Sequence, residues 1–212
     1  MSVGRSEDEF YVDSAALRAF IAEVRAIVAR ATSPGETVVA LREPFSRLLA
    51  DRAWLSTAFR QSSPKSGMGG GISSWLVYRS ADRSLTLMSL VVPPGSATPV
   101  HDHLSWGLVG LYDGTQEERL YREVGGSGNG HGQLELVTVR QLQVGQFYDL
   151  IPPENDIHSV KTTSLTASIS LHLLANDIGC IWRHTYDPEK STISPFRSGY
   201  TNVECEDGSE LG

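Results

Sequence analysis

Three things are scarce in this sequence: cysteine, clustered positive charge and long apolar runs. Only two cysteines, Cys180 and Cys205, occur among 212 residues, and neither belongs to a CxxC pair. So few cysteines fit a reducing compartment better than a disulfide framework, so we expect two unpaired thiols and a cytoplasmic location. The first residues are acidic and lack an apolar signal core, which agrees with that expectation.

The charge and hydropathy of the chain argue against two kinds of partner. The formal net charge is −7, and the 18 Lys and Arg side chains never gather into the basic cluster that phosphate binding needs. No segment approaches the roughly 18 consecutive apolar residues of a membrane span. We therefore expect no nucleic acid and no membrane as partner, and a small molecule is the better candidate.

The order of the sequence patterns predicts one domain, 1–212, that is mainly β with a helical N-terminal segment. Residues 10–60 carry apolar side chains at helical spacing after the cap candidates Asp13 and Ser14. Residues 72–188 hold short stretches rich in β-branched and aromatic residues, with turn residues between them. These predicted strands are 72–79, 84–92, 108–111, 118–121, 134–142, 147–151 and 165–174. So many short strands in about a hundred residues predict a sandwich or a barrel.

Two further regions are expected to lie outside the regular strands. Residues 125–132 are rich in glycine, and no helix pattern follows them, so we expect a mobile excursion between strands rather than a phosphate loop. Residues 191–212 are polar and become acidic near their end. We expect this C-terminal tail to lie on the surface or to be partly disordered.

The most informative segment is 95–107, GSATPVHDHLSWG, which runs from a Pro-Gly turn into a predicted strand. His101 and His103 are one residue apart, so on a strand both imidazoles point to the same face and can reach one ion. The spacing Gly-x5-His-x-His-x3-Gly-x6-Gly resembles the first motif of the cupin superfamily. In that motif a glutamate ligand usually stands where this chain has Gly107.

A third histidine, His158, ends the segment 145–158, GQFYDLIPPENDIH, which resembles the second cupin motif. Asn155 stands where the motif has a turn glycine, and asparagine tolerates a positive φ better than most residues. The resemblance implies a cupin barrel, a double-stranded β-helix, in which His101, His103 and His158 hold one metal ion. Without the glutamate the ion has one negative charge fewer around it, so its open positions suit anionic ligands.

The all-histidine variant of this pattern resembles the cysteine dioxygenase family of thiol dioxygenases over roughly residues 72–188. Within that family the bacterial 3-mercaptopropionate dioxygenase branch is the nearest in pattern, since it also has glycine at the position of Gly107. The resemblance implies Fe(II) as the metal. It also implies that a small thiol carboxylate, 3-mercaptopropionate-like or cysteine-like, is oxidised by O2 to its sulfinate. Because cupin barrels often pair, a homodimer is a candidate state.

The same resemblance assigns three further residues to the site. The family has a Ser-x-His-x-Tyr relay beside the metal, and Ser170 and His172 match its first two members, which position the metal-bound ligands. Leu174 stands where the family has the tyrosine, so the phenol that faces the substrate is missing. Arg183 resembles the arginine that binds the substrate carboxylate, a role that its planar fork suits.

The sequence leaves several alternatives open. Because of Leu174, a three-histidine cupin dioxygenase that acts on a carbon centre is a rival, and a non-catalytic metal- or ligand-binding cupin is another. Ser170 and His172 could be interior polar residues with local partners, and Arg183 a solvated residue. Imidazole also suits zinc, copper and nickel. Three aromatic residues are candidates either for the pocket wall or for core packing: Trp106, Tyr148 and Tyr186.

Overall fold

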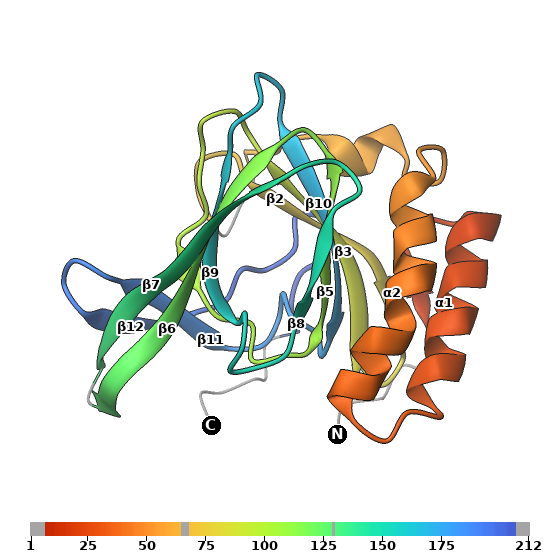
Figure 1. Ribbon diagram of the computed structural model, residues 1–212. Coiled ribbons are helices and arrows are strands. Elements are labelled where there is room, and N and C mark those ends of the chain that lie inside the picture. Colours follow the sequence, from red (N-terminus) through yellow and green to blue (C-terminus); the bar gives the residue numbers. More distant parts are fainter. Residues whose placement is uncertain (1–6, 65–67, 129, 207–212) are drawn as a thin grey trace.

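A β-barrel with two helices on one side makes up the computed structural model, which describes residues 7–64, 68–128 and 130–206 (Figure 1). The helices are α1 (Ala15–Val28) and α2 (Pro34–Ala50), followed by a 3-10 turn, Thr57–Arg60. The strands are β1 (Glu9–Phe10), β2 (Ser73–Arg79), β3 (Leu85–Val92), β4 (Val100–His101), β5 (Gly107–Asp113), β6 (Gln116–Gly128), β7 (His131–Leu142), β8 (Phe147–Leu150), β9 (Ile157–Thr162), β10 (Ser168–Ala175), β11 (Arg183–Asp187) and β12 (Thr192–Phe196). The predicted fold class, mainly β with an N-terminal helical segment, is confirmed.

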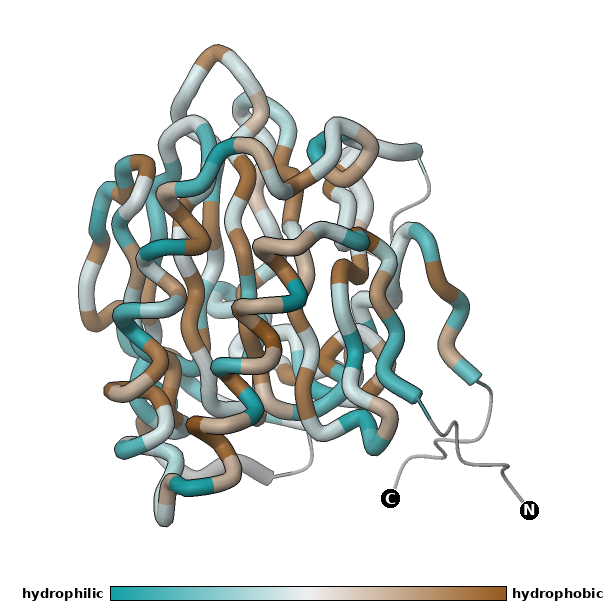
Figure 2. Tube along the Cα trace, turned by 90° about the vertical axis from the view of Figure 1, so that its right-hand side faces the viewer, coloured by the Kyte–Doolittle hydropathy of each residue, from teal (hydrophilic) through white to brown (hydrophobic). Residues whose placement is uncertain are grey.

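Both helices begin at a serine cap, and Ser14 is one of the two cap candidates of the sequence. The hydroxyl oxygen of Ser14 accepts a hydrogen bond from the Leu17 amide at 3.2 Å, and that of Ser33 accepts one from the Glu36 amide at 3.3 Å. Such caps satisfy amides that have no partner within the helix. Figure 2 shows hydrophobic and hydrophilic residues alternating along the helices, the pattern of elements with one buried face.

The strands form two antiparallel sheets that face each other (Figure 1). One sheet has the order β1-β2-β3-β10-β5-β8, and the other closes in the order β11-β12-β7-β6-β9-β4. Helices α1 and α2 cover the outer face of the first sheet. The first sheet therefore has two buried faces, one against the helices and one towards the barrel interior.

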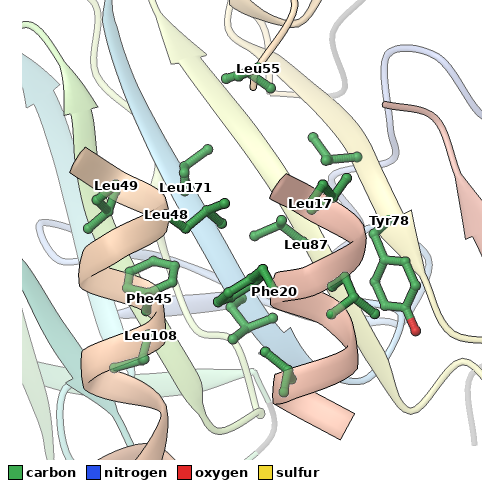
Figure 3. Close-up of a cluster of buried hydrophobic side chains, with 14 of the residues drawn as sticks. Leu17, Phe20, Phe45, Leu48, Leu49, Leu55, Tyr78, Leu87, Leu108 and Leu171 are labelled. Carbon is green, nitrogen blue, oxygen red and sulfur yellow. The ribbon is translucent and has the colours of Figure 1, made fainter. Parts of the chain in front are cut away.

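The residues of β10 divide between two hydrophobic clusters. Leu171 and Leu173 pack with the helices in the outer cluster, which Figure 3 shows around Phe20 and Phe45. Leu174 belongs to the inner cluster, inside the barrel. Since side chains alternate along a strand, the even positions of β10 point into the barrel and the odd positions towards the helices.

The glycine-rich stretch 125–132 is not a separate excursion, as far as the described residues show. Strand β6 continues to Gly128 and β7 starts at His131, so the two strands form a long antiparallel arm. The pairing accommodates the glycines through a register shift between Val124 and Gly128. The expectation of a loop was wrong because glycine weakens a strand without preventing its pairing. Residue 129 lies outside the described residues.

The C-terminal segment is folded back onto the barrel as far as residue 206. It contains β12, and its later part bonds to β2, since the Thr201 amide donates to the Ser74 carbonyl at 2.7 Å. Asn202 also bonds to both main-chain groups of Leu76. Residues 191–206 are almost all half-buried or exposed, so this segment lies at the surface, which is one of the two expected outcomes, while its pairings with β2 could not be read from a polar composition. Residues 207–212 lie outside the described residues.

The two cysteines are paired, so the expectation of unpaired thiols is wrong. Cys180 and Cys205 form a disulfide with their Cα atoms 5.3 Å apart. The folded-back C-terminal segment brings Cys205 to Cys180, an approach that cysteine number alone could not reveal. Since disulfides persist mainly in oxidising compartments, one ground for the cytoplasmic location is lost, and that location stays a prediction. Within the described residues, no helix has the length and apolarity to cross a membrane.

Candidate metal centre

Three histidines, from β4, from the residues just after it and from the paired strand β9, converge inside the barrel. His101 ends β4, His103 follows two residues later, and His158 on β9 is the register partner of His101. All three are at least 96% buried, and their ring centroids lie 4.7 to 5.0 Å apart. One nitrogen from each ring lies within 4.8 Å of the other two. The fold therefore brings together the three predicted ligands.

The Nδ1 atom of each ring is engaged away from the cluster. His101 Nδ1 donates to the Pro99 carbonyl oxygen at 2.9 Å, and His103 Nδ1 donates to the Asp156 carbonyl oxygen at 3.1 Å. A carbonyl oxygen only accepts, so these two Nδ1 atoms carry the proton and each Nε2 keeps a lone pair. His158 Nδ1 donates to Glu118 Oε1 at 2.7 Å. In all three rings, therefore, Nε2 is the nitrogen whose lone pair is left to coordinate a metal ion.

The Nε2 atoms that the Nδ1 contacts leave available fit the donor set of a metal ion. His158 Nε2 is buried and has no hydrogen-bond partner among the described residues. A buried nitrogen is rarely left without a partner, and three convergent imidazole nitrogens suit a divalent ion. Burial, with His158 and Arg183 nearby, holds the pKa of His101 and of His103 well below its usual value. Both imidazoles are therefore neutral, as a metal ligand must be.

The position of the usual glutamate ligand has no room for any side chain. A Cβ on Gly107 would lie 2.1 Å from the Leu173 carbonyl oxygen and 2.9 Å from the Leu174 Cα. Gly107 on β5 is the register partner of Leu174 on β10, and the two backbones meet closely there. The close approach of β5 and β10 at this point therefore explains why glycine stands where the usual motif has glutamate. The other departure, Asn155, has the positive φ expected of it, 57°.

Ser170 and His172 lie together inside the barrel beside the three histidines. The Ser170 hydroxyl is 2.9 Å from His172 Nε2, and the His172 ring centroid is 6.4 Å from that of His103. Burial lowers the pKa of His172 to about 3, so its imidazole is neutral. His172 Nδ1 is buried, and the described residues offer it no partner. The pair thus lies beside the three-histidine cluster, and its role stays a prediction.

Arg183 is buried close to the cluster, so the solvated alternative is excluded. Its NH1 donates to the Asp102 carbonyl oxygen at 2.6 Å, and its NH2 donates to the Ser198 hydroxyl at 3.0 Å. Burial lowers the pKa of Arg183 to about 10, so the guanidinium is charged at neutral pH. Nε is buried without a partner in the described part of the chain. NH1 and NH2 each use one of their two N–H groups in these contacts, so one N–H on each and the Nε–H remain as donors.

The three aromatic candidates occupy different places. Tyr148 lies inside the barrel, with its hydroxyl 3.1 Å from His158 Nδ1. Tyr186 donates to the buried carboxylate of Asp102 at 3.0 Å and so helps to hold the strand of the first two histidines. Trp106 lines a cavity of about 560 Å³ beside Leu104, and none of the three histidines borders that cavity.

Three buried carboxylates around the site had no role in the sequence analysis. Asp102 Oδ1 accepts from the His184 amide at 2.7 Å, and Asp156 Oδ1 accepts from the His103 amide at 2.8 Å. Glu118 is fully buried on β6. Burial acts to raise the pKa of Glu118, but hydrogen bonds and charge from His158 and Arg140 outweigh it and leave the pKa below its usual value. In the sequence Glu118 looks like a surface residue next to Glu117.

Comparison with solved structures finds cupin-type barrels at low identity. A Klebsiella pneumoniae protein with a double-stranded β-helix domain matches with 13% identity and a TM-score of 0.42, covering 69% of this chain and 98% of that one. An RmlC-like cupin from Shewanella frigidimarina matches with 13% identity and a TM-score of 0.40, covering 59% and 92%. KdgF from Halomonas sp. matches with 16% identity and a TM-score of 0.37, covering 51% and 82%. No family model matches the chain.

These similarities concern the barrel and carry no argument about activity. The fold itself is defined by the two facing antiparallel sheets, and the site by the three-histidine cluster that could hold a metal ion. Which metal, which substrate and which reaction belong to the proposals below.

Proposed function

We propose that the protein is a mononuclear non-haem Fe(II) thiol dioxygenase that oxidises a small thiol carboxylate to its sulfinate. The observation that carries the proposal is a buried set of three histidine donors with no carboxylate ligand. Three protein ligands leave open positions on one ion, as a catalytic metal requires. Iron bound there would supply the oxygen chemistry.

The charge around the site favours an anionic substrate. Histidine ligands bring no negative charge to a bound ion, so a divalent ion would keep most of its positive charge, and the buried guanidinium of Arg183 adds to it. A thiolate that also bears a carboxylate matches both charges. Arg183 Nε–H has no partner among the described residues, and with a neighbouring N–H of the guanidinium it would pair with such a carboxylate.

Ser170 and His172 support the proposal as positioning groups. The neutral His172 ring is held on one side by the Ser170 hydroxyl, and its Nδ1 is left to bond a ligand in the site. The overall reaction places both oxygen atoms of O2 on the sulfur of the thiol, so it needs no external reductant. The chain's contribution is to hold the two reactants in a fixed geometry and to exclude water.

The proposal is tested by anaerobic loading with Fe(II) and measurement of O2 uptake and sulfinate. 3-Mercaptopropionate, cysteine and mercaptosuccinate carry a carboxylate, whereas cysteamine does not and so tests the role of Arg183. Sulfinate formed in proportion to oxygen, and lost in His158→Ala, is the expected result. Iron bound tightly with no thiol-dependent uptake would overturn the proposal.

Leu174 favours a second candidate, oxidation of a carbon centre in a chelating substrate such as a diketone. Its side chain is fully buried in the inner apolar cluster, together with Met88 and Val109. An apolar wall there suits a substrate with more hydrocarbon than a small thiol acid. O2 uptake with a diketone and none with thiols would support this candidate. Metal binding without any O2 uptake would instead indicate a non-catalytic cupin.

A further inference from the structure

Glu118 is a buried carboxylate directly behind one of the three histidines. It lies on β6, which pairs with β9, and its side chain has no solvent exposure. Oε1 accepts the Nδ1 proton of His158 at 2.7 Å, and Oε2 forms an ion pair with Arg140. The other two histidines have main-chain carbonyls in the same position. His158 is therefore the one ring of the three whose Nδ1 hydrogen-bonds a carboxylate, while the Asp156 carboxylate oxygen Oδ1 lies 3.6 Å from His103 Nδ1.

The surroundings of Glu118 keep its carboxylate in place. The Arg140 guanidinium lies 4.0 Å from the ring centroid of Tyr148, and the Tyr148 hydroxyl is 3.1 Å from His158 Nδ1. The carboxylate is thus enclosed by an imidazole, a guanidinium and a phenol. Burying a carboxylate without partners would cost free energy. These contacts are therefore part of the folded interior and not a chance ion pair at the surface.

We propose that Glu118 is a positioning residue that sets the tautomer of His158 and strengthens its Nε2 as a metal donor. A carboxylate that accepts a hydrogen bond from a ligand imidazole raises the basicity of the ligating nitrogen. The usual glutamate ligand cannot exist at Gly107, where a Cβ would meet backbone atoms at 2.1 and 2.9 Å. Glu118 thus supplies negative charge to the site through His158 instead of by direct coordination.

The test compares Co(II) binding by Glu118→Gln with Glu117→Gln as the matched control. Glu117 is the preceding residue of the same strand and pairs with Arg119 at 3.0 Å, so its substitution removes the same charge without touching a histidine. Co(II) alone is titrated against a competing chelator, and the visible spectrum of the bound ion is recorded. A 10- to 100-fold loss of affinity is expected for Glu118→Gln, with a changed spectrum, and no change for Glu117→Gln.

A four-variant comparison separates positioning from a general effect on the fold. Glu118→Gln is measured in the native background and in His158→Ala, each variant first shown by circular dichroism to be folded. If Glu118 acts through His158, its substitution causes no further loss of Co(II) affinity in the His158→Ala background. An equal loss in both backgrounds, or an unchanged affinity in the native background, overturns the proposal.

A second variant covers the case in which Glu118→Gln fails to fold. Glu118→Asp then takes its place in the same comparison, because the shorter side chain keeps the charge but cannot keep the 2.7 Å contact. The proposal rests on the three-histidine metal site and not on thiol oxidation. Since the readout is Co(II) binding, its failure is distinguishable from failure of the proposed activity.

Discussion

Gly107 is the residue at which the barrel excludes the usual glutamate ligand, and its substitution by alanine tests that exclusion. The new Cβ would lie 2.1 Å from the Leu173 carbonyl oxygen, 2.7 Å from Leu174 Cδ2 and 2.9 Å from Leu174 Cα. Two of these three atoms belong to the backbone of β10, so a change of rotamer does not relieve the contact. The two paired strands would have to separate by about 1 Å to restore ordinary contact distances.

We expect Gly107→Ala to lower the free energy of unfolding by about 3 kcal/mol or more, at or above the upper end of what overpacking usually costs. A typical domain has only about 5 to 15 kcal/mol of stability, so the loss is a large share of it. Gly107→Glu is expected to be at least as damaging and cannot restore a carboxylate ligand. The measurement is urea unfolding of the metal-free protein, followed by circular dichroism.

Gly35→Ala is the matched control for this prediction. Gly35 lies in the first turn of α2, and a Cβ there meets nothing within 4 Å. Alanine in a helix reduces the freedom of the unfolded chain, so this substitution is expected to raise stability by up to about 1 kcal/mol. Equal stability of Gly107→Ala and the native protein would refute the close approach of β5 and β10.

Four further outcomes are expected. Cys180→Ser opens a loop of 25 residues and is expected to cost about 3 kcal/mol, so a reductant should lower the urea midpoint of the native protein but not that of the variant. Burial lowers the pKa of His172 to about 3, below its unfolded value of about 6.5, so the unfolded state holds more protons between these values. The free energy of unfolding should therefore fall as the pH drops from 7 to 5. In His172→Gln this fall should be smaller by up to about 1.4 kcal/mol per pH unit. Arg183→Lys should raise KM about tenfold or more for thiol carboxylates but not for cysteamine, and an equal rise for both would contradict carboxylate binding. The homodimer stays a prediction. Light scattering should give a molecular mass twice that of one chain if it forms.

Local periodicity predicted the parts of the structure that depend on neighbours in sequence. The period of two places His101 and His103 on one face, and it places Ser170, His172 and Leu174 together inside the barrel. For the residues of β10 this required only the knowledge that the segment is a strand, whereas β4 ends at His101 and His103 lies two residues beyond it. The start of α1 was predictable from local sequence as well, since the cap candidate Ser14 accepts a hydrogen bond from the amide three residues later.

The features that the sequence did not predict depend on strand register and on the path of distant segments. Glu118 reaches His158 because β6 pairs with β9 in the register that sets Leu120 opposite His158. Nothing near Glu118 in the sequence indicates which strand will lie beside it. The disulfide has the same origin, since Cys205 meets Cys180 only after the chain has returned along β2.

The Nδ1 contacts of the three histidines also bear on how this site can change during evolution. The partners of His101 and His103 are the carbonyl oxygens of Pro99 and Asp156, which any amino acid would provide at those positions. Point mutation cannot delete those two contacts without moving the main chain. The partner of His158 is a side chain, so a single codon change at Glu118 alters it. Substitution at this position of β6 can therefore change the Nδ1 hydrogen bond of a metal-binding histidine without moving the main chain.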